Sequence, residues 1–388
     1  MKKLMPLLVG LVLPLTVTPQ ILESDSLALV DFYNALDGDN WVNNDSWLSS
    51  PVEEWHGITI DAGRVTRIRL TSNGLSGTIP LSFNDLESLE EVYLTSNEIT
   101  SPLPDMSNLT NVTTFAFYDN NLNSTFPESI RNLTGIRILN LGSNSLTGEL
   151  PEWLPELNRL EDLSLTTNNL NGEIIEVLRD LPNLEKIRLF GNEFSGPLPD
   201  FSIFSSLKEL VVGRNDFTGT FPGWITEIDS LRYLHLGDCE LSGTVPENLF
   251  SQLYPGMRQF VIYGNDFTGQ LENILDAYMP EMFRFNIAGN NFTGYIPDGV
   301  FDVHNVYRWN ISNNDITGLP DFSEANHTPT WFYCTNNKIG FEHLETCLGL
   351  QESRPGRLQL GPQNALLEEE NLNPNAGEDI LIDCGSRG

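Results

Sequence analysis

Residues 141–151 read LGSNSLTGELP, and nearly the same phrase returns as LTSNGLSGTIP at 70–80 and IAGNNFTGYIP at 287–297. Aligning these phrases reveals a repeat of about 24 residues with the pattern L-x-x-L-x-L-x-x-N-x-L-x-G-x-I-P-x-x-L-x-x-L. Twelve copies align, the last degenerate, and they start at Val65, Leu89, Val112, Ile136, Leu160, Leu184, Leu207, Leu231, Met257, Met282, Val306 and Pro329. Because insertions between copies are small, one uninterrupted repeat array is predicted over 65–340.

Each half of the repeat has a predicted structural role. In L-x-x-L-x-L the alternating apolar residues point inward from a short strand, and the residues between them face outward. Successive strands should stack in parallel, and the inner face of such a sheet must be covered by the rest of each repeat. The Gly-x-Ile-Pro phrase predicts a tight turn followed by a second extended piece. Residues expected to cover the sheet are Leu86, Ile130, Leu178, Ile228 and Leu249.

The asparagine of the repeat occupies one equivalent inward position, where its amide can bond to backbone groups as the chain turns. Stacked copies should therefore form a ladder. Its predicted members are Asn73, Asn97, Asn144, Asn192, Asn215, Asn265, Asn290 and Asn314. Cys239 takes this position in the eighth repeat, so a structural role is predicted for it rather than a reactive one.

These motifs resemble the plant-type leucine-rich repeat family, whose hallmark is the same Leu-x-Gly-x-Ile-Pro phrase. The resemblance covers residues 65 to about 340. It implies an α/β repeat solenoid: a right-handed, curved horseshoe with a parallel β-sheet on the concave face and a helical N-terminal cap. It also implies a role in recognition and not in catalysis.

Residues 21–64 are predicted to form the N-terminal cap, which a solenoid needs to cover its first repeat. Ser and Asp residues precede a helical pattern at Leu27, Val30, Phe32 and Leu36. Three tryptophans then supply bulky cover, namely Trp41, Trp47 and Trp55. The Trp55-His56-Gly57 phrase resembles the family's cap, but the usual cysteine pair is missing, which favours a bacterial surface protein of similar architecture. Residues 37–40, DGDN, predict a polar turn, because Leu48 stands where a calcium loop needs its last carboxylate.

The two ends of the sequence predict separate segments. Residues 1–20 have a Lys2-Lys3 start and a short apolar run, which is typical of a signal peptide. Residues 341–357 are predicted to form a C-terminal cap, in which a disulfide between Cys334 and Cys347 and an unpaired, inward Cys334 are equally favoured. Residues 358–388 resemble a linker and the start of a truncated immunoglobulin-like module.

Composition and motifs exclude several classes of function. The chain has 53 acidic and 21 basic residues, a formal net charge of -32, which argues against nucleic-acid binding. The five histidines show no metal-ligand spacing, and neither a cofactor fingerprint nor a catalytic motif is found. No segment after the signal is apolar enough to span a membrane. We therefore expect a secreted or cell-surface protein that is not an enzyme and uses no cofactor.

The outward strand positions carry the functional signal. Basic residues there are Arg67, Arg69, Arg137, Lys186, Arg188, Lys208, Arg214, Arg232, Arg258, Arg284 and Arg308. Acidic residues there are Glu90, Glu91, Asp119, Glu161, Asp162, Glu185, Glu209 and Asp238. The net charge of these outward positions is near +3, although the chain as a whole is strongly acidic. Tyr, Trp and Arg also occur toward the C-terminal half of this face, and together these features predict a partner-binding surface. The predicted binding residues are Lys186, Arg188, Tyr233, His235, Arg258, Tyr263, Arg284, Tyr307, Arg308, Trp331 and Tyr333.

The favoured function is adhesion or recognition of a protein or an acidic glycan on this concave face. Two alternatives stay open on the family resemblance: the ligand-recognising ectodomain of a receptor-like kinase, and an inhibitor of extracellular glycan-degrading enzymes. An ice-binding role is a more remote option, since outward Thr residues are few. Asn-x-Ser/Thr sequons also occur, and the repeat's own composition explains them as well as glycosylation does.

Overall fold

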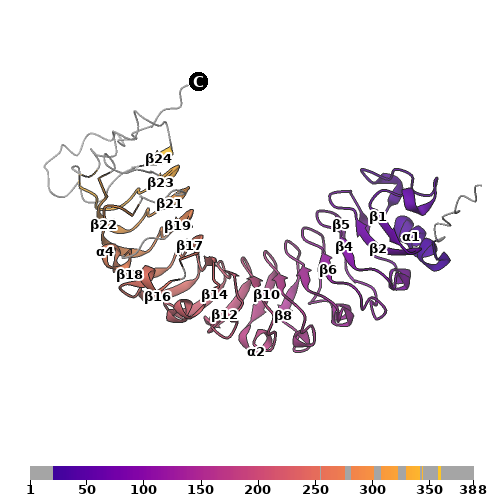
Figure 1. Cartoon of the computed structure of the whole chain (residues 1–388), viewed down its shortest axis with the longest axis horizontal. Helices are drawn as coiled ribbons and strands as arrows, with labels where there is room; N and C mark the ends of the chain where they lie inside the picture. Colours follow the sequence, from indigo (N-terminus) through magenta and orange to yellow (C-terminus); the bar gives the residue numbers. More distant parts are fainter. Residues whose placement is uncertain are drawn as a thin grey trace, which may run out of the picture.

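The computed structural model describes residues 21–253, 255–275, 281–300, 307–321, 329–340, 343 and 357–359. The chain winds into an open arc, with short strands along its inner side and helical turns along its outer side (Figure 1). The fold is therefore the curved α/β solenoid that the repeat predicts.

Fourteen strands of the described residues form one sheet along the concave side. β1 pairs with β2 antiparallel, and every later pair in this sheet is parallel, as stacked repeats require. In order, the strands are β1 (Ile58–Asp61), β2 (Arg64–Arg69), β4 (Glu91–Tyr93), β6 (Thr114–Ala116), β7 (Ile138–Asn140), β9 (Asp162–Ser164), β11 (Lys186–Arg188), β13 (Glu209–Val211), β15 (Tyr233–His235), β17 (Gln259–Val261), β19 (Arg284–Asn286), β21 (Arg308–Asn310), β23 (Trp331–Tyr333) and β24 (Arg357–Gln359).

The L-x-G-x-I-P half of the repeats forms the second extended piece that the sequence predicts. It builds an eight-stranded sheet from β8 (Thr147–Glu149), β10 (Asn169–Gly172), β12 (Glu193–Pro197), β14 (Asp216–Thr220), β16 (Glu240–Thr244), β18 (Asp266–Gln270), β20 (Asn291–Tyr295) and β22 (Asp315–Gly318). Nearer the N-terminus, β3 (Ser76–Gly77) pairs with β5 (Glu98–Ile99).

Helix α1 and two 3-10 turns lie in the cap, and short helical turns lie on the outer side of several repeats. The α-helices are α1 (Glu23–Ala35), α2 (Ile175–Leu178), α3 (Leu249–Gln252) and α4 (Leu271–Ile274). The 3-10 turns are η1 (Gly38–Asn40), η2 (Val52–Glu54), η3 (Leu81–Asp85), η4 (Glu128–Asn132), η5 (Leu154–Glu156) and η6 (Gly223–Glu227). None of the helices within the described ranges is long and apolar enough to cross a membrane.

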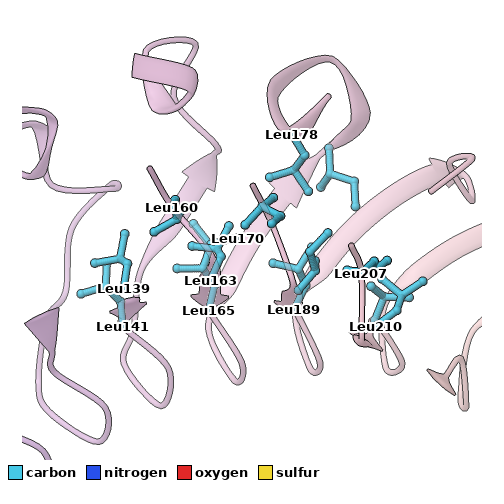
Figure 2. Packing of buried hydrophobic residues seen from close by; sticks show 14 of the residues in the cluster. Leu139, Leu141, Leu160, Leu163, Leu165, Leu170, Leu178, Leu189, Leu207 and Leu210 are labelled. Carbon is cyan, nitrogen blue, oxygen red and sulfur yellow. The ribbon is translucent and has the colours of Figure 1, made fainter. Parts of the chain in front are cut away.

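The repeat leucines stack into one continuous core between the sheet and the outer turns. Figure 2 shows Leu139, Leu163 and Leu210, which share one strand position in their repeats, and Leu189, which lies two residues further along in its own repeat, all buried in this core. The predicted covering residues are all buried, and each is at most 2% exposed: Leu86, Ile130, Leu178, Ile228 and Leu249. Burial of this kind stabilises the fold by about 25 cal/mol per Å² of apolar surface.

The predicted asparagine ladder is present and ties each repeat to the one before it. The Nδ2 of Asn192 donates to the carbonyl oxygens of Leu165 and Leu189, both at 2.9 Å, and its Oδ1 accepts from the Leu170 N–H at 3.1 Å. The sequence analysis missed three members, Asn120, Asn168 and Asn337, which make the same bonds. At the N-terminal end Asn73 exchanges bonds with the backbone of Asn43, so the cap continues the ladder.

Cys239 stands in the ladder as a weaker member. Its Sγ lies 3.9 Å from the carbonyl oxygen of Val212 and 4.0 Å from that of Gly237. Burial raises the pKa of the thiol to about 11, which keeps it protonated and unreactive. The geometry agrees with the structural role predicted for this residue.

The residue before each ladder position has a left-handed backbone, with φ between 49° and 70° in all twelve repeats. Ser, Asp, Asn and Gly accept this conformation readily, which explains their frequency there. The residues are Ser72, Ser96, Asp119, Ser143, Thr167, Gly191, Arg214, Asp238, Gly264, Gly289, Asn313 and Asn336. The turn that ends each concave strand is thus the same along the arc.

The N-terminal cap corrects two predictions. Phe32 and Leu36 of the predicted pattern are buried, but Leu27 is 59% exposed and Val30 only partly buried, because helix α1 buries Ala28, Leu29 and Tyr33 together with Phe32 instead. The expected Ser/Asp capping is absent too, since Leu22 is the N-cap residue and makes no side-chain capping bond.

Asp25 and the three cap tryptophans connect the cap to the first repeat. The buried Asp25 carboxylate accepts bonds from the Val65 N–H and the Arg64 guanidinium of strand β2. The tryptophans are buried, as predicted, in edge-to-face and tilted contact with one another: Trp41, Trp47 and Trp55.

Several predicted segments lie outside the described residues, namely the signal peptide at 1–20, nearly all of the cap at 341–357 and most of the tail at 358–388. Cys334 is fully buried in an inward position. Since Cys347 lies outside the described residues, its pairing with Cys334 stays a prediction.

We expect Asn192→Ala to lower the free energy of unfolding by about 1–3 kcal/mol, because it leaves the buried Leu170 N–H without its acceptor and removes one of the two amide donors from each of the Leu165 and Leu189 carbonyls. Urea unfolding followed by circular dichroism measures this. Asn121→Ala, at an exposed position three repeats away, is the control and should change stability by less than about 0.5 kcal/mol. Equal losses in the two variants would contradict the ladder's role.

Candidate functional site

In-register pairing of the concave sheet arranges the outward residues in columns, with neighbours about 4.8 Å apart. One column is Lys186, Glu209, Tyr233, Gln259, Arg284, Arg308 and Trp331. The next is Arg188, Val211, His235, Val261, Asn286, Asn310 and Tyr333. The remaining predicted residues flank strands β17 and β21: Arg258, Tyr263 and Tyr307.

The columns pair most charges of the face with one another. Every basic residue of the face from Arg67 to Arg214 has a carboxylate within 4 Å. The pairs are Arg67–Glu91 (2.6 Å), Arg69–Glu91 (3.9 Å), Arg137–Glu161 (2.7 Å), Lys186–Asp162 (3.2 Å), Arg188–Asp162 (2.7 Å), Arg188–Glu209 (2.7 Å), Lys208–Glu185 (2.7 Å) and Arg214–Asp238 (3.1 Å). A count of residues gives the whole face an excess of positive charge. Because the basic residues from Arg67 to Arg214 are all paired, this excess is not distributed evenly along the face.

These ion pairs give Lys186 and Arg188 a role inside the sheet. The Arg188 guanidinium donates to Glu209 through Nε and Nη2, at 2.7 and 2.8 Å, and to Asp162 through Nη1 at 2.7 Å. Its side chain is only 27% exposed. Of the predicted binding residues, these two have the least capacity left for a partner.

Phe190, His235 and Tyr263 form a cluster of rings at the end of strands β11, β15 and β17. The His235 ring meets Phe190 and Tyr263 edge to face, with centroids 5.1 and 5.5 Å apart. The Arg214 guanidinium lies 5.3 Å over the Phe190 ring and is held there by its ion pair with Asp238. Aromatic pairs of this geometry contribute about 0.5–1.5 kcal/mol beyond their area burial.

Two glycines make room for these rings. A Cβ on Gly213 would lie 2.5 Å from Nδ1 of His235, and a Cβ on Gly237 would lie 2.5 Å from the Tyr263 ring. Any side chain at either position would displace the ring above it. The glycines therefore fix an aromatic platform on the face.

His235 is uncharged at neutral pH. Burial, followed by the neighbouring Arg284, lowers the pKa of its imidazole to about 4. The Gly237 N–H donates to Nδ1 at 3.3 Å, which assigns the proton of the neutral ring to Nε2. The centre of the platform is thus neutral, although charged residues surround it.

Strand β15 and the residue before β17 bring Tyr233 and Arg258 together. Nη1 of Arg258 donates to the Tyr233 hydroxyl at 3.4 Å, and Nη2 lies 3.5 Å from the Glu281 carboxylate. The guanidinium is 40% exposed, and Glu281 is itself half exposed, so this pair is screened by water. Arg258 can therefore exchange its carboxylate for a partner's group at little cost.

Arg284 and Arg308 differ from the other basic residues of the face. They are neighbours on β19 and β21, and within the described ranges neither has a carboxylate at ion-pair distance. The Arg308 guanidinium lies 5.5 Å over the Tyr333 ring, which stacks on Trp331 with centroids 6.1 Å apart. Tyr307 beside them is 52% exposed. Unneutralised cations and accessible rings thus meet over β19–β23.

The sequence analysis missed one apolar feature of the face. Tyr118 and Ile138, near strands β6 and β7, are 38% and 40% exposed. Their outward positions in the repeat could have identified them. The predicted binding residues were chosen by charge and residue type, and these lie in the other half of the face. They form an uncharged area between two groups of ion pairs.

Comparisons with known proteins agree with this architecture. The Leucine Rich Repeat family profile matches residues 135–157 and 230–252. A probable leucine-rich-repeat receptor-like serine/threonine-protein kinase of Arabidopsis thaliana is 42% identical over 64 residues, which cover 16% of this chain and 7% of that protein. A probable inactive receptor kinase of the same plant is 32% identical over 111 residues, covering 27% and 17% of the two chains.

Among solved structures, the Arabidopsis receptor kinase HAESA, in complex with the peptide hormone IDA and the co-receptor SERK1, matches with a TM-score of 0.70 and 26% identity. The match covers 82% of this chain and 54% of that one. The fold and the comparisons together define a leucine-rich-repeat solenoid. More particularly, two of its repeats match the Leucine Rich Repeat model, and the arc is similar in fold to the leucine-rich repeats of plant receptor kinases.

The low pKa of His235 predicts a specific pH dependence. In the unfolded chain the imidazole takes up a proton near its ordinary pKa of about 6.5, whereas the folded ring does so only near 4. Stability is therefore lost as pH falls through this window. Relative to His235→Gln, which cannot be protonated there, the wild type should lose on the order of 2 kcal/mol of unfolding free energy between pH 7 and pH 4. Urea titrations at both pH values measure this, and a pH-independent difference between the proteins would refute it.

Proposed function

We propose that this chain is a non-catalytic extracellular recognition protein that binds a protein partner on its concave face, over strands β15–β23. The observation that carries the proposal is the distribution of charge pairing along the face. From Arg67 to Arg214 the basic residues are neutralised by neighbouring carboxylates, whereas Arg284 and Arg308 have no carboxylate at ion-pair distance among the residues that the structure describes. The basic side chains that are available to bind a partner thus lie at one end of the arc.

The residue types found there suit protein recognition. Tyr, Trp and Arg dominate the energetics of protein interfaces because they combine large contact area with directed hydrogen bonds. Tyr307, Trp331 and Tyr333 supply rings, and Arg258 supplies a guanidinium held by a pair that water screens. The unneutralised cations favour an acidic partner.

The relatives support an extracellular setting and a protein partner. Two of them are receptor kinases, one described as inactive, and the matched HAESA structure contains a peptide hormone and a co-receptor. A peptide or protein ligand is accordingly favoured over an acidic glycan, and an ectodomain role over inhibition of glycan-degrading enzymes. This chain spans only a small part of those kinases.

Selection from a displayed peptide library tests the proposal, with an array of acidic glycans as the parallel arm. Peptides enriched on the wild-type chain should lose at least about 100-fold in affinity when Arg258, Arg284 and Arg308 are all changed to Glu. The control changes three arginines outside the concave strands in the same way, Arg131, Arg159 and Arg179, so that both variants gain equal negative charge. The control variant should bind like the wild type.

Two results would contradict this proposal. If enriched peptides bind the triple face variant as tightly as the wild type, the concave face is not the binding surface. If only the glycan arm yields a ligand that depends on these arginines, the partner is an acidic glycan and not a protein.

A further inference from the structure

Two arginines of the concave face, Arg67 and Arg137, share a bonding pattern. The Nε of Arg67 donates to Glu91 at 2.6 Å, and the Nε of Arg137 donates to Glu161 at 2.9 Å. In both cases the acceptor is the carboxylate at the same column position of the next repeat. A guanidinium on one strand thus reaches toward the following strand and finds an acid there.

Arg284 breaks this pattern. The residue at its column position in the next repeat is Arg308, so a second cation stands where the carboxylate should be. The Nε of Arg284 is buried and has no hydrogen-bond partner in the part of the chain that the structure describes. Like charges on directly opposed strands destabilise a sheet, and a buried donor without a partner does so too. Within the described ranges this arrangement therefore lacks the counter-ion that the basic residues from Arg67 to Arg214 have.

We infer that Arg284 and Arg308 form a subsite for a carboxylate of the partner, which would take the position that Glu91 occupies beside Arg67. The inference rests on the proposed recognition function and specifies which group of an acidic segment is bound. A carboxylate would lie between the two guanidiniums and, once the Arg284 side chain rotates to expose its buried Nε, accept from that Nε. Its planar pair of oxygens matches the donor fork of arginine.

The surroundings prepare this subsite for an anion. Burial, and then the charge of Arg308, lower the pKa of Arg284, which reports how poorly its charge is solvated. Arg308 is exposed, and its other face is supported by the Tyr333 ring. His235, whose pKa is lowered by burial and by the charge of Arg284, is neutral and does not compete for the anion. Charge-assisted hydrogen bonds gain strength in such a partly desolvated site.

The side-chain Nε–H resonance of Arg284 in the full chain, observed by NMR with ¹⁵N-labelled arginine, reports directly on this subsite. The probes are three short peptides: acetyl-triglutamate amide, acetyl-triglutamine amide and acetyl-triglutamine with a free carboxyl terminus. We expect the glutamate peptide to shift the resonance saturably and the glutamine amide to leave it in place. The third peptide shows whether a single terminal carboxylate is enough, and a shift by it also supports the subsite.

Arg308→Gln should weaken this binding by about fivefold or more, since one charge-assisted hydrogen bond is lost. The matched control is Arg137→Gln, which removes a paired arginine elsewhere on the face and should leave the affinity unchanged. The subsite is refuted if all three peptides shift the resonance equally, if none does, or if Arg308→Gln has no effect. Should it be refuted while charge reversal still abolishes binding of a selected peptide, the proposed function would stand and only its carboxylate subsite would fail.

Discussion

The asparagine ladder is the constraint on which the rest of this structure depends. Each ladder amide bonds the backbone of its own repeat and of the one before it, as Asn192 does with Leu189 and Leu165. A buried amide in this position fixes the height and register of every coil, because its donors and acceptor have no alternative partners. The stacked leucine core and the uniform left-handed turn before each ladder residue then follow. The regular columns of outward residues are a consequence of this register.

The columns determine which charged side chains of the concave face lie next to each other. Two residues at the same position of adjacent repeats are forced to lie one strand apart, so opposite charges pair and like charges repel. Arg67 with Glu91 shows the first case, and Arg284 with Arg308 shows the second. A pair that opposes stability within an otherwise neutralised face is the kind of exception that proteins keep at functional sites. The same register sets the ring platform around His235, where glycines on neighbouring strands leave space for the rings.

Much of the fold was predictable from the sequence, because in a repeat of about 24 residues the position of each residue indicates whether it faces inward or outward. The parallel sheet, the covering leucines and most of the ladder follow from periodicity alone. The buried face of the cap helix was harder to predict, since its thirteen residues contain several overlapping apolar stripes. Leu27 lies on a stripe that is exposed in the structure. Counting charges located an excess of basic residues on the concave strands but did not show how those residues pair with carboxylates. The pairing of Arg188 with Glu209 needed the strand register as well as the count, although the spacing of the repeats contained that information.

The central claim is that the partner is held by its acidic group between β19 and β21. A crystal structure of the chain with the tightest acidic peptide obtained by selection tests it most directly. The account predicts a peptide carboxylate within hydrogen-bond distance of Nε of Arg284, with Arg308 on its other side and the ion pairs from Arg67 to Arg214 unchanged. A peptide bound on the outer side of the arc, or over β4–β9 with no group near Arg284, would contradict it.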